Sequence, residues 1–100
     1  MSRFAVSLAA MLLAACAPLR IHDAPVYWSV HQLSVAEIEA AIAAMQSDLP
    51  EVRSQKLRKI YVVDNDTICL SYGEASERFQ NTYEVKRIRG RWHYTGYIII

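Results

Sequence analysis

The sequence predicts an α+β domain in which one amphipathic helix packs on an antiparallel sheet of about four strands, with a short extra strand before the helix. Apolar residues recur at steps of three and four over residues 34–49, which is the period of an α-helix. From residue 57 onward apolar and polar residues alternate, which is the period of a β-strand. A length of 100 residues with 53% hydrophobic and 21% charged residues fits a single folded domain.

The helix is expected to begin after Ser34, because Ser34 and Glu37 have the spacing of a capping box. Leu33 and Ile38 are placed for a hydrophobic staple around the same cap, and Pro50 should end the helix. The apolar stripe consists of Val35, Ile38, Ile42, Met45 and Leu49. We interpret this stripe as core rather than as a docking surface, because the neighbouring sheet can cover it.

Two hairpins are expected to form most of the sheet. The alternating segments are residues 57–63, 67–73, 82–88 and 91–100, and residues 26–31 form the short extra strand. Asn65-Asp66 and Arg89-Gly90 suit two-residue turns, which would place Val63 opposite Ile68 and Val85 opposite Tyr94.

This register gives the sheet two different faces. The apolar face, which the helix should cover, would carry Tyr61, Val63, Ile68, Leu70, Tyr72, Tyr83, Val85, Trp92, Tyr94 and Ile98. The mixed face would carry Arg58, Ile60, Val62, Thr67, Cys69, Ser71, Glu84, Lys86, Ile88, Arg91, His93, Thr95 and Tyr97.

The mixed face is the expected partner surface, because one helix cannot cover both sides of a sheet. Its candidate binding residues are Arg58, Lys86, Arg91, His93 and Tyr97, with Ile60 and Val62 adding apolar contact area. The alternative is that these cations only keep hairpin ends and edge strands soluble.

The sequence offers little catalytic chemistry. Asp64 and Asp66 have a spacing that suits a divalent cation, but Asp and Asn are also typical of a tight turn. The three histidines lack the spacing of metal ligands, and Cys69 and His93 are expected about 9 to 10 Å apart, too far for a nucleophile and its base. We therefore predict a protein that is not an enzyme and needs neither cofactor nor metal. A formal charge of +1 also argues against a nucleic-acid partner.

The first residues have the pattern of an export signal. Arg3 supplies one positive charge, and residues 4–13 form an uncharged apolar run that is too short to span a bilayer. Leu13-Ala14-Ala15-Cys16 follows, and this motif resembles the lipobox of bacterial lipoproteins. The alternatives are an ordinary secretory signal cut at an alanine and a buried hydrophobic segment.

The resemblance to lipoproteins implies that Cys16 carries fatty acyl chains such as palmitate and becomes the mature N-terminus. Residues 1–15 would be the signal peptide, residues 16–25 the lipidated cysteine and a tether, and residues 26–100 the domain. Ala17, in place of the aspartate that favours inner-membrane retention, implies sorting to the outer membrane, facing the periplasm, if the source is Gram-negative.

The expected function is that of a non-enzymatic binding or accessory module of the cell envelope. The membrane would be one partner, through the lipid, and an envelope protein or cell-wall polymer the other. The alternative is an inhibitor or immunity-type protein that acts on an envelope enzyme.

Overall fold

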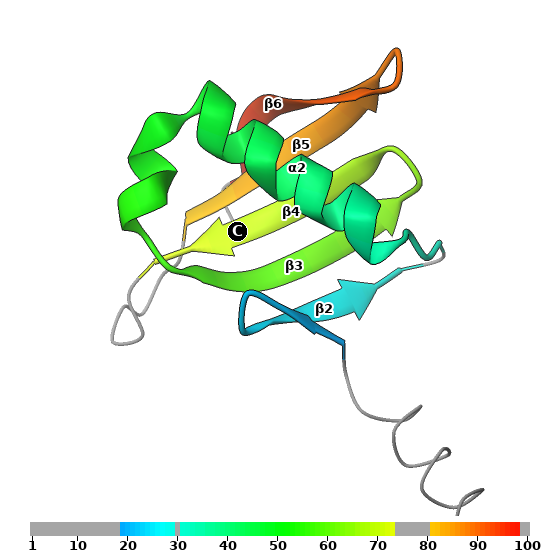
Figure 1. Ribbon diagram of the computed structural model, residues 1–100, viewed down its shortest axis with the longest axis horizontal. Coiled ribbons are helices and arrows are strands. Elements are labelled where there is room, and N and C mark those ends of the chain that lie inside the picture. Colours follow the sequence, from blue (N-terminus) through cyan, green and yellow to red (C-terminus); the bar gives the residue numbers. More distant parts are fainter. Residues whose placement is uncertain (1–18, 30, 74–80, 99–100) are drawn as a thin grey trace, which may run out of the picture.

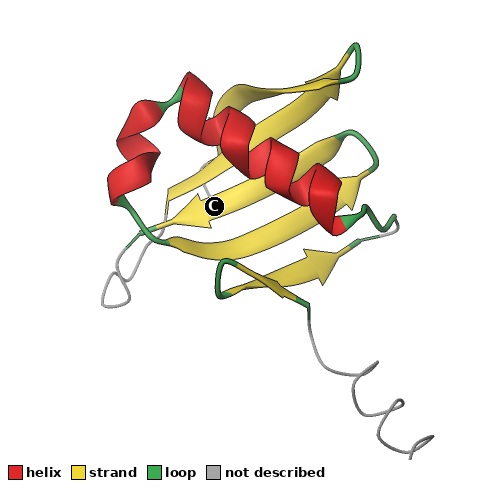
Figure 2. Cartoon of the chain, viewed as in Figure 1, coloured by secondary structure: helices red, strands yellow, loops and turns green. Residues whose placement is uncertain are grey.

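The computed structural model describes residues 19–29, 31–73 and 81–98 (Figures 1 and 2). Its helices are α2 (Val35–Asp48) and the short 3₁₀ helix η1 (Pro50–Ser54). The strands are β1 (Arg20–Ile21), β2 (Ala24–Trp28), β3 (Leu57–Asp64), β4 (Thr67–Tyr72), β5 (Asn81–Ile88) and β6 (Arg91–Ile98).

The strands form one sheet in the order β1-β2-β3-β4-β5-β6, and α2 lies across one of its faces (Figure 2). This confirms the α+β class with one helix on a sheet, but the sheet has six strands rather than about four. It is also mixed, because β2 runs parallel to β3 while the other neighbours are antiparallel. The reason is the helix, which joins β2 to β3 as a crossover and returns the chain to the same end of the sheet.

Helix α2 begins and ends where the sequence predicts. The Glu37 backbone amide donates to Ser34 Oγ at 3.2 Å, so Ser34 is the N-cap. Only half of the capping box forms, because the Glu37 carboxylate instead accepts a hydrogen bond from the Trp92 indole. Pro50 starts η1 directly after the helix, since proline fits the first position of a helical turn but not its interior.

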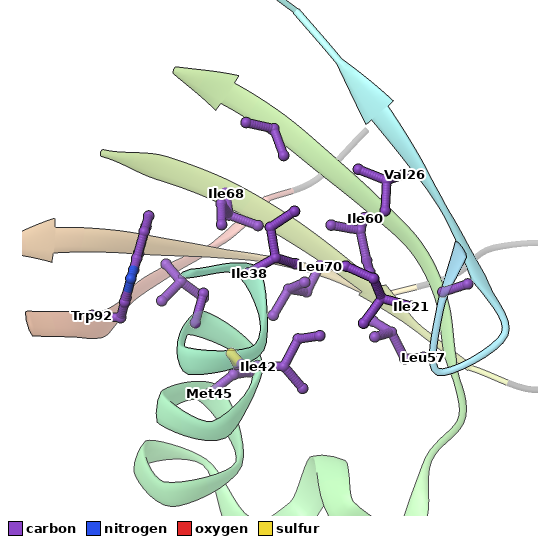
Figure 3. Close-up of a cluster of buried hydrophobic side chains, with 14 of the residues drawn as sticks. Ile21, Val26, Ile38, Ile42, Met45, Leu57, Ile60, Ile68, Leu70 and Trp92 are labelled. Atoms are coloured by element: carbon purple, nitrogen blue, oxygen red, sulfur yellow. The ribbon is translucent and has the colours of Figure 1, made fainter. Parts of the chain in front are cut away.

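The core lies between α2 and the sheet (Figure 3). From the predicted stripe, Ile38, Ile42 and Met45 are buried and Leu49 packs at the margin, whereas Val35 remains largely exposed. From the sheet, the core residues include Val26, Leu57, Ile60, Val62, Ile68, Leu70, Tyr72, Val85 and Trp92.

The predicted pairing of β3 with β4 is correct next to their turn but wrong by one residue for the rest of β3. Thr67 pairs with Asp64 as expected, but Val62 rather than Val63 lies opposite Ile68, because a bulge falls between Val62 and Asp64. Val62 is consequently 1% exposed in the core while Val63 is 42% exposed. A slip of one residue exchanges the two faces of a strand.

The same bulge moves Ile60 and Tyr61. Ile60 pairs with Leu70 and is completely buried, so neither Ile60 nor Val62 offers the apolar contact area expected of them. Tyr61 pairs with Cys69 and stacks on Tyr27 of β2, with ring centroids 5.3 Å apart. Tyr61 therefore lies on the face away from α2, which we call the open face.

The β5–β6 hairpin follows the predicted register from its turn as far as Val85 opposite Tyr94. A bulge between Glu84 and Val85 then shifts the remainder of β6. Tyr97 lies opposite Tyr83 as a result, and Ile98 lies opposite Thr82 on the open face. The expected faces of Tyr97 and Ile98 are thus exchanged.

The expected tether overlaps the sheet. Residues 20–25 form β1, a two-residue turn and the start of β2, with Ile21 and Ala24 buried in the core. His22 and Asp23 both have positive φ, as a type I′ hairpin turn requires. The folded part of the chain therefore starts no later than Arg20, only four residues after Cys16.

Candidate functional site

The structure brings together three of the five predicted partner-surface residues. Lys86 pairs with His93 across β5 and β6, and Arg91 lies beside them at the β5–β6 turn. All three side chains are exposed, and Ile88, which pairs with Arg91, is exposed as well. We call Lys86, Arg91 and His93 the distal basic group.

Arg58 does not belong to this group. It lies at the start of β3, whereas Lys86 pairs with Thr67, which itself faces Asp64 at the far end of β3. Six residues of strand separate these two ends, which corresponds to roughly 20 Å. The two cations therefore cannot contact the same small ligand.

Tyr97 does not belong to it either. Its ring packs edge-on against Tyr83, with centroids 5.5 Å apart, and its hydroxyl donates to Asn81 Oδ1 at 3.1 Å. Tyr83 also contacts the rings of Tyr72 and Tyr94, so Tyr97 is the outer member of a tyrosine cluster on the helix side of the sheet.

Arg58 lines a hollow near the opposite edge of the sheet, which the sequence did not reveal. The hollow has a volume of about 380 Å³ and lies between the β1–β2 turn and the start of β3. We call it the proximal pocket, and its lining residues are Arg20, Asp23, Pro25, Lys56, Leu57 and Arg58. Among these described lining residues three are cations and one is a carboxylate, so the pocket is suited to an anion.

Backbone geometry holds Arg20 over this pocket. Its guanidinium Nη1 donates to the Asp23 carbonyl at 2.9 Å, across the type I′ turn. The same turn lies next to α2, where His22 Nε2 is 3.5 Å from Glu39 Oε1. The pocket forms only once β1 is in the sheet, which explains why sequence patterns in residues 16–25 did not indicate it.

Arg87 is the most connected charged residue among those described. Its guanidinium lies 3.0 Å from Asp66 Oδ1 and 3.2 Å from Glu37 Oε2, donates to the Asn65 carbonyl at 2.8 Å, and stacks on Trp92. The hydrogen bond with Asp66 raises the pKa of Arg87, so its charge is secured. These contacts fasten the start of α2 to the β3–β4 turn, which is a structural role.

Asp64 and Asp66 form a hairpin turn rather than a cation site. The Asp66 amide donates to Asp64 Oδ1 at 2.8 Å, which lowers the pKa of Asp64. Asp66 is engaged by Arg87, so the two carboxylates do not face a common point. Within residues 19–29, 31–73 and 81–98, no three His, Cys, Asp or Glu side chains gather closely enough to hold a metal ion.

Cys69 lies on the open face as predicted, but it is only 8% exposed. Burial raises the pKa of its thiol, and Glu84, its cross-strand neighbour, raises it further. His93 is two strands away and pairs with Lys86 rather than with Glu84. This arrangement keeps the thiol protonated and away from any base that would activate it.

No protein-family model, curated protein or solved structure matches the chain.

Among the described residues, no helix is long and apolar enough to cross a membrane.

Proposed function

We propose that this protein is a lipid-anchored binding or accessory module of the cell envelope and that it performs no chemistry of its own. The observation that carries the proposal is the lipobox-like Leu13-Ala14-Ala15-Cys16 followed so closely by strand β1. An acylated Cys16 would be joined to Arg20 by a segment that extends at most about 14 Å. The domain would then be held directly against the bilayer.

The anchor would be permanent for a physical reason. Each buried methylene stabilises membrane insertion by about 0.8 kcal/mol, so one acyl chain holds a protein only marginally and two or more hold it stably. Bacterial lipoproteins, which the motif resembles, carry at least two chains on this cysteine. With Ala17 next to it, the proposed location is the periplasmic face of the outer membrane if the source is Gram-negative.

Features of the described residues favour binding over catalysis. Cys69 is buried with a raised pKa, and Asp66 is committed to its ion pair with Arg87. The distal basic group is instead exposed, and its three side chains project from adjacent strands. Cations beside the exposed Ile88 suit an envelope protein that presents acidic residues around an apolar contact.

The test is the variant Cys16→Ser, expressed in full length and fractionated. We expect the parent protein to sediment with membranes and to resist salt extraction, whereas the variant accumulates as unprocessed precursor or as soluble protein. Cys69→Ser is the matched control, and it should sediment like the parent. Retention of Cys16→Ser in the membrane after salt extraction and signal cleavage would contradict the proposal.

A further inference from the structure

We propose that the proximal pocket binds the anionic phospholipid headgroups of the membrane to which Cys16 is anchored, so that the domain holds one orientation on the bilayer. This inference rests on the proposed lipidation and adds a second, electrostatic contact to it. It assigns Arg20, Lys56 and Arg58 to the membrane and leaves the distal basic group for the protein partner.

Chain length places the pocket at the membrane surface. Arg20 lines the pocket and lies four residues after Cys16. Even fully extended, four residues reach about 14 Å, and the acylated cysteine itself sits at headgroup level. Arg20 therefore stays within about 14 Å of the headgroups, so the domain needs only a small movement to bring the pocket against lipid phosphates.

The attraction must come from local rather than total charge. After removal of residues 1–15, the chain has ten basic and ten acidic residues and no formal net charge. Among the residues that the structure describes, the pocket lining brings three cations together with one carboxylate, that of Asp23. Among the ion pairs between described residues, none involves Arg20, Lys56 or Arg58. Basic side chains next to a membrane are attracted to anionic lipids when they lie within a Debye length, about 8 Å at physiological salt.

The remainder of the domain would then point away from the bilayer. β1 and β6 are the two edges of the sheet, and the β5–β6 turn lies far from the β1–β2 turn (Figure 1). The distal basic group is roughly 20 Å from Arg58. This separation is more than twice the Debye length, so headgroups bound at the pocket would leave Lys86, Arg91 and His93 accessible to a partner in solution.

Lysine labelling of the lipidated protein in vesicles can test this orientation. The protein is reconstituted into phosphatidylcholine vesicles with and without phosphatidylglycerol and treated with a membrane-impermeant amine reagent, and each site is followed by peptide mass spectrometry. Lys56 reports on the pocket, and Lys86 is the matched control on the other side of the molecule. We expect phosphatidylglycerol to slow labelling of Lys56 at least about fivefold, with Lys86 unchanged.

Variants identify the cations responsible. Arg20→Gln with Arg58→Gln should abolish most of the protection of Lys56, since each cation near the surface contributes about a fivefold factor. Arg89→Gln with Arg91→Gln, which removes the same charge near the β5–β6 turn, should leave the protection intact. Salt at about 1 M, where the Debye length is about 3 Å, should abolish it in the parent protein.

Three results would overturn the inference: equal labelling of Lys56 in both kinds of vesicle, equal protection of Lys56 and Lys86, or full protection of Lys56 by inorganic phosphate in neutral vesicles. The last result would assign the pocket to a free anion instead of a lipid surface. A protein that floats with neither kind of vesicle lacks the lipid, and that result would overturn the proposed function and this inference with it.

Discussion

The two basic regions of this domain contain similar residues but are built and placed differently. In the proximal pocket, Arg20 is fixed by a backbone carbonyl at a type I′ turn, four residues after Cys16. In the distal basic group, Lys86 and His93 stand side by side on a regular stretch of hairpin, with exposed side chains. We infer that distance from the anchor, rather than charge itself, decides which region meets the membrane and which meets a protein.

This comparison depends on the register of β3, and paired valine variants provide the strongest test of that register. Val62→Ala should lower the free energy of unfolding by about 2 kcal/mol, because it removes two buried methyl groups and leaves a cavity. Val63→Ala removes the same atoms from an exposed position and should change it by less than about 0.5 kcal/mol. Denaturant unfolding measures both. A larger loss of unfolding free energy for Val63→Ala than for Val62→Ala would contradict the bulge and support the register without it.

The distal basic group can be separated from the pocket by its effect on partner binding. Lys86→Ser with Arg91→Ser should weaken binding to the protein that copurifies with the lipidated chain about tenfold, if each exposed ion pair contributes roughly 0.7 kcal/mol. Stability should fall by less than about 0.5 kcal/mol for each substitution. Titration binding with the purified partner gives the affinity, and Arg53→Ser is the control. Unchanged affinity in the double variant would remove the distal basic group from the interface.

A longer connection between Cys16 and the domain should weaken the contact of the proximal pocket with the membrane. Insertion of about ten glycine and serine residues between Ala17 and Pro18 leaves the anchor in place but lowers the effective concentration of headgroups at the pocket. We expect the protection of Lys56 by anionic vesicles to fall about fivefold, with flotation unchanged. If protection persists undiminished, the pocket does not depend on its short connection to Cys16.

Cys69 lies in β4, between the two basic regions, and its thiol should react only slowly in the native protein. Burial raises the pKa of its thiol, so alkylation of the native protein at neutral pH should be at least about tenfold slower than that of the unfolded chain. The rate should rise as the pH approaches the raised pKa, because the thiolate is the nucleophile. Non-reducing electrophoresis should show monomer only. A reducible dimer of the native protein would indicate that Cys69 is accessible.

Local signals were sufficient to predict the helix and two of the hairpin turns, those between β3 and β4 and between β5 and β6. Ser34 and Pro50 mark the ends of α2 because capping and proline geometry act within one helical turn. The Arg89-Gly90 turn keeps its predicted register because both residues adopt the positive φ that matches strand twist. Asn65 and Asp66 do not have positive φ, and the bulge at Val63 lies directly before their turn, at the end of β3.

Features that depend on distant parts of the chain were not predictable in this way. The parallel pairing of β2 with β3 is long-range, and Ile21 belongs to the core only because β1 folds back on β2. The extra residue of the β5–β6 bulge is Thr95 of β6, opposite the step from Glu84 to Val85, and it moves Tyr97 away from the predicted partner surface. Lys86, Arg91 and His93 were grouped correctly because they flank a regular turn. The proximal pocket was missed because two segments form it that lie 30 residues apart in the sequence, residues 20–25 and 56–58.

Acylation of Cys16 as the first residue of the mature protein can be measured directly by mass spectrometry of the N-terminal peptide. The protein is purified in detergent from the membrane fraction and digested with trypsin, which cleaves after Arg20. We expect the peptide 16–20 with the added mass of at least two fatty acyl chains and no peptide that contains residues 4–15. An unmodified peptide 4–20, or one that begins at Ala17, would contradict this expectation.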